Sequence, residues 1–293
     1  MKDDIANKVR RLNSEIWDLL REFLGLEIYQ SDFLLKEKHI FEGFAELDPK
    51  GGHRDFLFSS MESKISDSKI SSSQLALRHQ IWADQLSGFH ISNFTSITST
   101  FEKTVDALDE YYFTERIFYE LESLTLSTQY SQLPDIPPFE ILLTLFKDKI
   151  PTFNPLARGG YYLFLAYHEP ENPEHLDNMF SLIETHESEI EKTPLRNLTT
   201  GALNLLIQLN NQDRKKYMPR LLEGYLFILE KGWICIENCL EVRHFNNVIT
   251  LLLQHGKIVQ AEKIYFEWES NLLTNSPDFA QNFNLGKILL EKY

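Results

Sequence analysis

The stretch that decides the fold is residues 245–265, which read FNNVITLLLQHGKIVQAEKIY. Apolar and small residues recur there at intervals of two to four positions on both sides of a glycine: Phe245, Val248, Leu252, Gly256, Ile258, Ala261 and Tyr265. Residues three and four apart lie on one face of a helix. We therefore predict a helix, a turn at Gly256, and a second helix whose apolar face begins at Ile258.

The same pattern begins again near the C-terminus. Asn282, Leu285, Gly286 and Leu289 repeat the spacing of a first helix. Repeated helix–turn–helix units predict an all-α fold of stacked antiparallel helical hairpins, an α-solenoid, with a helical N-terminal portion. Such arrays bind partners more often than they perform chemistry.

The composition agrees with a folded, helical protein. The chain has 293 residues, of which 43% are hydrophobic and 13% aromatic, whereas glycine (12) and proline (11) are scarce. Few helix breakers imply long elements, and this hydrophobic content is too high for a disordered chain. The length allows one large domain or two ordinary ones.

Charge and cysteine content indicate which partners and which cellular compartment to expect. The formal net charge of −14 disfavours binding to nucleic acid, because phosphate backbones are repelled. Two cysteines are too few for a disulfide framework and indicate a reducing compartment. The N-terminus is charged and lacks an apolar signal core, and no apolar run is long enough to span a membrane. We expect a cytoplasmic protein that does not bind membranes.

A heptad pattern runs through the first predicted helix, residues 3–30. Apolar residues alternate steps of four and three at Ile5, Val9, Leu12, Ile16, Leu19, Phe23 and Leu26. Trp17, Leu20 and Leu24 widen this face, which favours packing against other helices of the same chain. Two interpretations remain, a monomer or a homodimer through helix 3–30. Residues 31–48 are predicted as a second helix.

The middle of the chain has mixed signals. We interpret Ser59–Ser73, which is rich in Ser, Lys and Asp, as a frayed helix or an exposed joint. Helices are predicted at 74–87 and 93–129. The proline-rich break Leu133–Pro138 is the best internal boundary, which gives an N-terminal helical region (1–132) and C-terminal repeats (133–293), or one continuous array.

Polar residues before prolines predict helix starts in the second half of the chain. The pairs are Asn154-Pro155, Asn172-Pro173, Thr193-Pro194 and Ser276-Pro277. Proline is tolerated at the first helical position, and the residue before it can cap a free amide. The first three starts lie 18 and 21 residues apart, so that two helices occupy about the length of one helical-hairpin repeat.

Residues 245–265 resemble a tetratricopeptide repeat. Large residues at Phe245 and Val248, Gly256 at the turn, and Ala261 and Tyr265 on the second helix carry the resemblance, and Asn284-Leu285-Gly286 resembles the next repeat. Ile249 and Trp268 stand where small residues are usual, which makes this a divergent member. The resemblance implies a TPR-like α-solenoid. The chain stops at Tyr293, where the next turn would begin, which leaves a shortened protein or a capping final helix as interpretations.

Most of the chain is also similar to a group of uncharacterised all-helical proteins from Bacteroidota-type bacteria. The points of likeness are Ala107–Tyr112, Arg116–Glu120, Phe245–Thr250 and Asn282–Leu285. These motifs are structural, so the similarity implies a helical-repeat fold and no activity.

Two sets of residues resemble parts of metal sites. Cys235, Cys239 and His244 have too few ligands for a structural zinc site, and buried thiols are the preferred interpretation. His186-Glu187 begins a zinc-protease motif, but Ile190 occupies the position of the second histidine. We therefore predict no catalytic residues, no metal site and no cofactor.

Two short motifs have structural interpretations. Gly159-Gly160 in a probable helix lacks the context of a phosphate-binding loop, so it favours a close helix crossing or a kink. The cluster Arg214-Lys215-Lys216 favours a solvated turn between helices.

The tetratricopeptide resemblance implies which residues would line a groove for a partner. They are Arg243, Asn246, Asn247 and Thr250, followed by Phe283, Asn284 and Lys287. Asparagine both donates and accepts hydrogen bonds, which suits an extended peptide. The alternative is that these asparagines cap or bridge neighbouring helices.

The sequence therefore favours a non-enzymatic scaffold or adaptor that binds a protein or peptide partner through a groove in its C-terminal half. The heptad pattern supports an alternative, an effector-sensing or dimerisation domain of a regulator whose output domain lies outside this chain. An unusual helical enzyme is a third class, disfavoured by the missing motifs.

Overall fold

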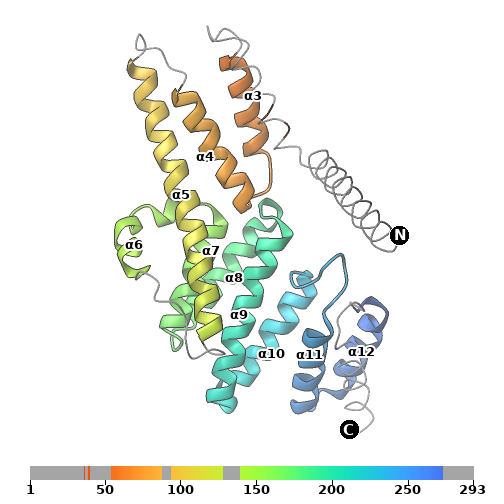
Figure 1. Ribbon diagram of the computed structural model, residues 1–293. Coiled ribbons are helices and arrows are strands. Elements are labelled where there is room, and N and C mark those ends of the chain that lie inside the picture. The colour runs from red at the N-terminus through yellow and green to blue at the C-terminus, as the bar shows by residue number, and fades with distance from the viewer. Residues whose placement is uncertain (1–35, 37–38, 40–53, 88–93, 128–138, 273–293) are drawn as a thin grey trace, which may run out of the picture. The chain divides into compact units, whose positions relative to one another are not determined.

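A computed structural model describes Lys36, His39 and residues 54–87, 94–127 and 139–272 (Figure 1). Within those residues the chain is built of helices and contains no β-strand, which confirms the all-α prediction. The α-helices are α3 (Arg54–Ser66), α4 (Ser72–Ser87), α5 (Phe94–Ser127), α6 (Phe139–Phe146), α7 (Pro155–His168), α8 (Glu174–His186), α9 (Lys192–Gln212), α10 (Arg214–Lys231), α11 (Val242–Gln254) and α12 (Ile258–Trp268). Short 3₁₀ turns are η1 (Ile150–Thr152), η2 (Glu187–Glu189) and η3 (Glu269–Asn271).

Several predicted features lie outside the described residues. They are the heptad helix 3–30, the helix 31–48 except for the helical residues Lys36 and His39, the break at 133–138, the Ser276-Pro277 start and the repeat from Asn282. None of the described helices combines the length and apolar character that a bilayer crossing requires.

Contacts divide the chain into two units, Met1–Tyr111 and Tyr112–Tyr293, so that the long helix α5 contributes its first part to one and its second part to the other. In the first unit α3 packs on α4. The core cluster of this unit lies on α3, α4 and α5 and consists of Phe58, Met61, Ile65, Leu77, Ile81, Trp82 and Ala107.

The structure corrects the interpretation of Ser59–Ser73. The segment is mostly the regular helix α3, with Met61 and Ile65 only 3% and 2% exposed. The link to α4 is held by side-chain bonds: the Gln74 amide donates to the Ile65 carbonyl (3.1 Å), and the Ser71 hydroxyl accepts from the Gln74 backbone N–H (3.3 Å). Burial of the apolar residues stabilises the helix in spite of its polar composition.

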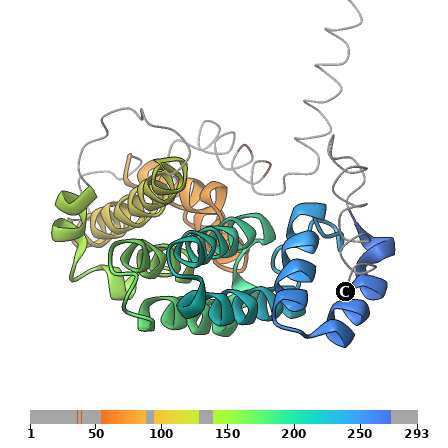
Figure 2. The ribbon, with the colours of Figure 1, turned by 90° about the horizontal axis from the view of Figure 1, so that it is seen from below.

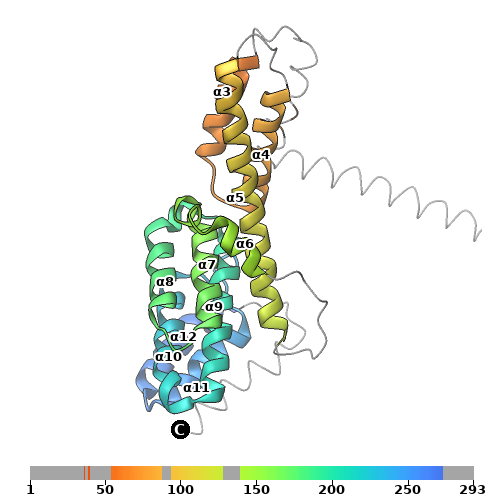
Figure 3. The same ribbon diagram turned by 90° about the vertical axis from the view of Figure 1, so that its left-hand side faces the viewer.

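In the second unit the helices form successive hairpins, α7–α8, α9–α10 and α11–α12. Neighbouring hairpins touch, because α7 also packs on α9 and α10 packs on α11. Figures 1 and 2 show these helices following one another across the unit in chain order, and Figure 3 shows α7, α8 and α9 side by side. Each hairpin therefore buries its apolar faces against its neighbours.

Phenylalanine rings join α5 and α6 to this unit. Phe113 on α5 is fully buried, and its ring centroid lies 5.8, 5.6 and 5.2 Å from those of Phe139, Phe146 and Phe153. Together with a 3.4 Å hydrogen bond from Asn154 Nδ2 to Thr114 Oγ1, these rings link the second part of α5 to α6 and to the turn before α7.

The predicted helix starts are confirmed in part. Asn154 caps α7, since its Oδ1 accepts from the Ala157 N–H at 2.9 Å and Pro155 is the first helical residue. Asn172 accepts from the Glu174 N–H at 3.1 Å, but α8 begins one residue after the proline. The Thr193 cap is wrong: α9 begins at Lys192, because the chain is already extended at Glu191 (ψ 149°).

Close helix approach explains the glycine pair in α7, as predicted. A Cβ on Gly159 would lie 2.8 Å from Cδ2 of Leu198 in α9, and one on Gly160 would lie 3.0 Å from Cγ2 of Ile117 in α5. Only a residue without a side chain leaves room for these neighbours.

The hairpin of residues 245–265 is confirmed as α11, a turn and α12. Gly256 has φ 68°, and its N–H donates to the Leu253 carbonyl at 2.9 Å. One detail is wrong, because Ile258 is 36% exposed and the buried face begins at Ala261, which is fully buried. Ile258 is the first residue of α12, next to the turn.

Candidate functional site

Three of the predicted partner-binding residues share one face of α11. Arg243, Asn247 and Thr250 are four and three positions apart, and Arg243 is 69% exposed while the other two are half-buried. Asn246 is only 7% exposed, which removes it from the predicted surface. Phe283, Asn284 and Lys287 lie outside the described residues.

Asn247 bridges two helices, as the alternative interpretation predicted. Its Nδ2 donates to the hydroxyl oxygen of Tyr225 on α10 at 2.8 Å, and Tyr225 is fully buried. Burial raises the pKa of Tyr225, although the bond from Asn247 acts in the opposite direction. The phenol therefore stays protonated and serves as a structural hydrogen-bonding group between α10 and α11.

His244 belongs to the same network. Its Nδ1 lies 3.4 Å from the Tyr225 hydroxyl, and the residue is 5% exposed. Burial, followed by the positive charge of Arg243, lowers the pKa of His244. At neutral pH the imidazole is therefore uncharged and can accept a hydrogen bond from Tyr225.

The cysteine pair does not lie on a helix. Cys235 and Cys239 lie in the loop between α10 and α11, where Ile236 and Cys239 form an isolated bridge. Both thiols are free, as expected, but they are half-buried instead of buried. Burial and the neighbouring Cys239 raise the pKa of Cys235, which makes it a poor nucleophile. No group of three or more His, Cys, Asp or Glu side chains in the described part of the chain is arranged to hold a metal ion.

The basic cluster after α9 also differs from its prediction. Arg214, Lys215 and Lys216 form the first turn of α10 instead of a loop, because Asp213 caps the helix by accepting from the Lys216 N–H at 3.2 Å. Lys216 also forms an ion pair with Glu171. Arg214 and Lys215 are exposed beside it.

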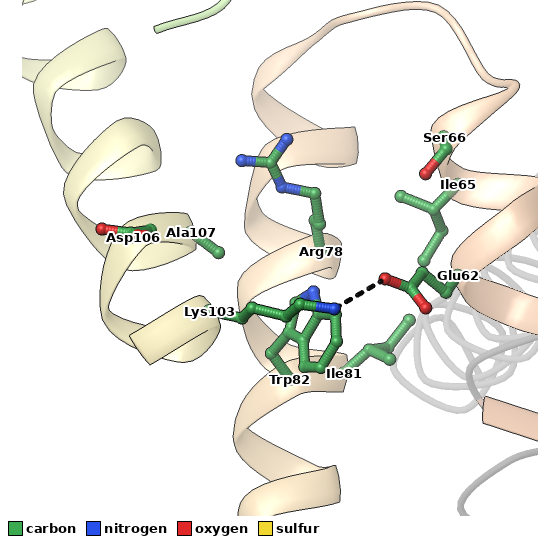
Figure 4. Close-up of a pocket in the computed structure, with 9 residues that line it drawn as sticks. All are labelled: Glu62, Ile65, Ser66, Arg78, Ile81, Trp82, Lys103, Asp106 and Ala107. Carbon is green, nitrogen blue, oxygen red and sulfur yellow. Dashed lines mark ion pairs between the residues drawn. The ribbon is translucent and has the colours of Figure 1, made fainter. Parts of the chain in front are cut away.

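A pocket of about 270 Å³ lies in the first unit, among helices α3, α4 and α5 (Figure 4). Each helix contributes both apolar and polar side chains. The lining residues are Glu62, Ile65, Ser66, Arg78, Ile81, Trp82, Lys103, Asp106 and Ala107.

The indole of Trp82 forms one wall of this pocket. Trp82 is 8% exposed and is held by the ring of Phe58, which meets it edge-on at a centroid distance of 4.7 Å. Lys103 extends from α5 across the indole, with its Nζ 4.4 Å from the ring centroid and 3.9 Å from Oε1 of Glu62 on α3 (Figure 4). The pocket therefore already binds an ammonium group, supplied by the chain itself.

The other cation of the pocket is fixed. Arg78 forms an ion pair with Glu110, which is only 7% exposed. Burial lowers the pKa of Arg78, but the guanidinium stays charged. The two cations face the carboxylates of Glu62 and Glu110, so the charges balance while Lys103 occupies the site and one negative charge is left when Lys103 moves out. This balance favours a positively charged ligand over an anion.

Lys103 is held weakly by comparison. Its side chain is 54% exposed, and Glu62 is 41% exposed. A cation–π contact at an exposed site is worth about 0.5–1 kcal/mol, and an exposed ion pair about 0–1 kcal/mol. A competing ammonium group could therefore displace the Lys103 side chain into solvent at small cost.

Sequence reasoning missed this pocket. Arg78 and Trp82 are four residues apart on one face of α4, which is a local signal. Glu62 and Lys103, however, come from helices about 20 residues away on either side, and no spacing rule links them. Glu62 was also missed because Ser59–Ser73 was interpreted as a frayed helix or an exposed joint.

Comparison with known proteins gave no relative. No family model matches the chain, and searches of curated proteins and of solved structures each returned no match. The function must therefore be argued from the geometry alone.

Proposed function

We propose that the chain is a non-enzymatic helical-repeat scaffold that binds a protein or peptide partner. The observation that carries this proposal is the succession of helical hairpins in the second unit, each packed against the next. A TPR-like solenoid presents the same face of each hairpin along one surface, which suits an extended partner better than a small substrate.

The face of α11 that carries Arg243, Asn247 and Thr250 is the proposed contact surface. Arg243 is the most exposed of these residues, and its Nη2 lies 3.8 Å from Glu241, which is too distant and too exposed to hold it firmly. Its guanidinium is thus available to a carboxylate or a carbonyl of a partner. Asn247 supports this face through Tyr225 and so orders α11 against α10.

Affinity capture with the full chain, followed by binding measurements on the recovered protein, tests the proposal. We expect Arg243→Glu to weaken binding by about ten-fold or more, because it reverses the charge of the most exposed residue of the surface. Arg214→Glu on α10 is the matched control, since Arg214 is also exposed and lies on another helix. Equal affinity of the two variants would reject the α11 surface, and recovery of a bound metabolite without any protein would reject the scaffold.

The dimerising or effector-sensing regulator remains a second proposal, supported by the heptad spacing of residues 5–26. Light scattering separates it from the scaffold. A concentration-independent monomer would count against a dimer through helix 3–30, whereas a dimer that is lost in Leu12→Asp and Leu19→Asp variants would support it.

A further inference from the structure

We propose that the pocket formed by α3, α4 and α5 binds a lysine side chain of the partner, and that Lys103 occupies this site when no partner is present. The inference rests on the proposed partner-binding function and names the chemistry that one contact would recognise. It uses the first unit of the chain, which the proposed α11 surface does not involve.

The position of Lys103 identifies the ligand. Its ammonium group lies over the Trp82 ring and near Glu62, so the site already accommodates an alkylammonium on a four-carbon stem. An incoming lysine can make the same two contacts from solvent. The stem would lie against apolar lining such as Ile81 and Ala107, as lysine stems commonly do.

Size and charge restrict what else could enter. The volume of about 270 Å³ falls just below the range of about 300–1,000 Å³ that is usual for small-molecule sites, so one side chain fits better than a whole metabolite. An acidic side chain would meet the carboxylate of Glu62. Arg78 cannot offset this charge for an anion, because it is paired with Glu110.

The net charge of the protein also favours a cationic ligand. A formal charge of −14 attracts basic segments over distances longer than direct contacts. A lysine-bearing peptide would thus be drawn to the surface before its side chain displaces Lys103. Release of the Lys103 side chain to solvent is the step that the structure makes inexpensive, since that side chain is already 54% exposed.

Binding can be measured on the full chain with model peptides. The probe is acetyl-Gly-Gly-Lys-Gly-Gly-amide, and the readout is the indole N–H resonance of Trp82 in a ¹⁵N-labelled sample. A single exposed cation–π and ion-pair site is worth at most about 2 kcal/mol, which predicts dissociation constants of about 30 mM or weaker. The counterpart peptides carry norleucine or glutamate in place of lysine, and n-butylammonium chloride represents a free amine.

Two substitutions distinguish specific binding from general attraction. Lys103→Met removes the competing ammonium while keeping the length of the side chain, and we expect it to tighten lysine-peptide binding at least about three-fold. Glu62→Gln removes the carboxylate, and we expect at least about three-fold weaker binding. Lys263→Met and Glu262→Gln on exposed positions of α12 make the same charge changes away from the pocket.

The proposal is supported if the Trp82 resonance shifts with the lysine peptide and the two pocket variants act in opposite directions, with both controls unchanged. Binding of n-butylammonium with an affinity similar to that of the lysine peptide would also support it, because both contacts are made by the alkylammonium group. The proposal is overturned if the norleucine or glutamate peptide binds as well as the lysine peptide, or if the Trp82 resonance does not move. Failure here leaves the scaffold proposal intact, because the Arg243→Glu test concerns a different helix and an independent readout.

Discussion

The side-chain amide of Asn247 on α11 donates a 2.8 Å hydrogen bond to the hydroxyl oxygen of Tyr225 on α10. This bond crosses from the hairpin α9–α10 to the hairpin α11–α12. Tyr225 is fully buried whereas Asn247 is half-buried, so water cannot substitute for the amide at the Tyr225 hydroxyl. It fixes the rotation of α11, on which the exposure of Arg243 depends.

Removal of either partner should lower the free energy of unfolding. We expect Asn247→Ala and Tyr225→Phe each to cost about 1–2 kcal/mol, because each leaves a polar group of the other without its bond. The double variant should lose less than the sum, with a coupling energy of about 0.5–1.5 kcal/mol. Urea unfolding followed by circular dichroism measures all three.

Asn211→Ala provides the control for the first prediction. Asn211 is exposed near the end of α9, so the same substitution should change stability by no more than about 0.5 kcal/mol. Additive effects of the Asn247 and Tyr225 substitutions would contradict the proposed coupling.

His244 should make stability depend on pH. Burial lowers its folded pKa below the ordinary value of 6.5, so the unfolded chain binds a proton more readily than the folded one. The stabilisation that comes from the uncharged imidazole is therefore fully present above about pH 6.5. It is lost as the pH falls through the lowered pKa of His244 in the folded state. Between about pH 7 and pH 5 we expect the wild type to lose about 1 kcal/mol more than His244→Gln.

The second cause of this shift offers an internal check. Arg243→Gln removes the neighbouring positive charge and leaves the imidazole in place, so the pKa of His244 should rise without reaching that of an exposed histidine, since burial is the larger cause. An NMR titration of the His244 ring reports this directly. A titration curve identical to that of the wild type would exclude the charge effect.

The hairpin α11–α12 could be predicted because its signals are local. Apolar spacing and a glycine within 21 residues were sufficient to place both helices and the turn. The exposure of individual residues was harder to predict. Because α11 packs against both α10 and α12, its buried surface is wide, and Asn246 is buried although the repeat pattern placed it outside.

The pocket of the first unit could not be predicted for a different reason. Its cation, its aromatic ring and its carboxylate come from α5, α4 and α3 respectively, and no periodicity within one helix brings them together. Polar composition also misled the prediction at α3, where a few buried apolar residues outweigh many serines. Tertiary packing overrode local preference at both positions.

Gly256 should tolerate substitution only by residues that accept a left-handed backbone. Its φ is 68°, and no atom lies within 4 Å of the position that a Cβ would take. The cost of Gly256→Ala is thus purely conformational, about 1–2 kcal/mol. Gly256→Asn should cost less than half as much, because asparagine adopts this conformation more readily. Equal losses of thermal stability for the two variants would show that contact, and not backbone conformation, sets the requirement.

The phenylalanine cluster around Phe113 should be the most sensitive position of the second unit. Phe113 is fully buried and contacts three other phenylalanine rings, so Phe113→Ala removes a large side chain and leaves a cavity that α5 and α6 cannot close. We expect a loss of about 3–5 kcal/mol in the free energy of unfolding. Phe113→Leu keeps most of the volume and should cost about 1–2 kcal/mol.

Tyr119→Ala tests whether the loss of stability on truncation of an aromatic ring in α5 depends on burial of that ring or only on its place in the helix. Tyr119 lies on the same helix six residues later, but it is 59% exposed. Its truncation removes an aromatic ring of similar size without opening a cavity, so we expect a change of less than about 1 kcal/mol. Guanidinium unfolding of the three variants under identical conditions gives the comparison. If Tyr119→Ala were as destabilising as Phe113→Ala, the second part of α5 would be stabilised by its exposed face, and the ring cluster would not be the core that holds it in place.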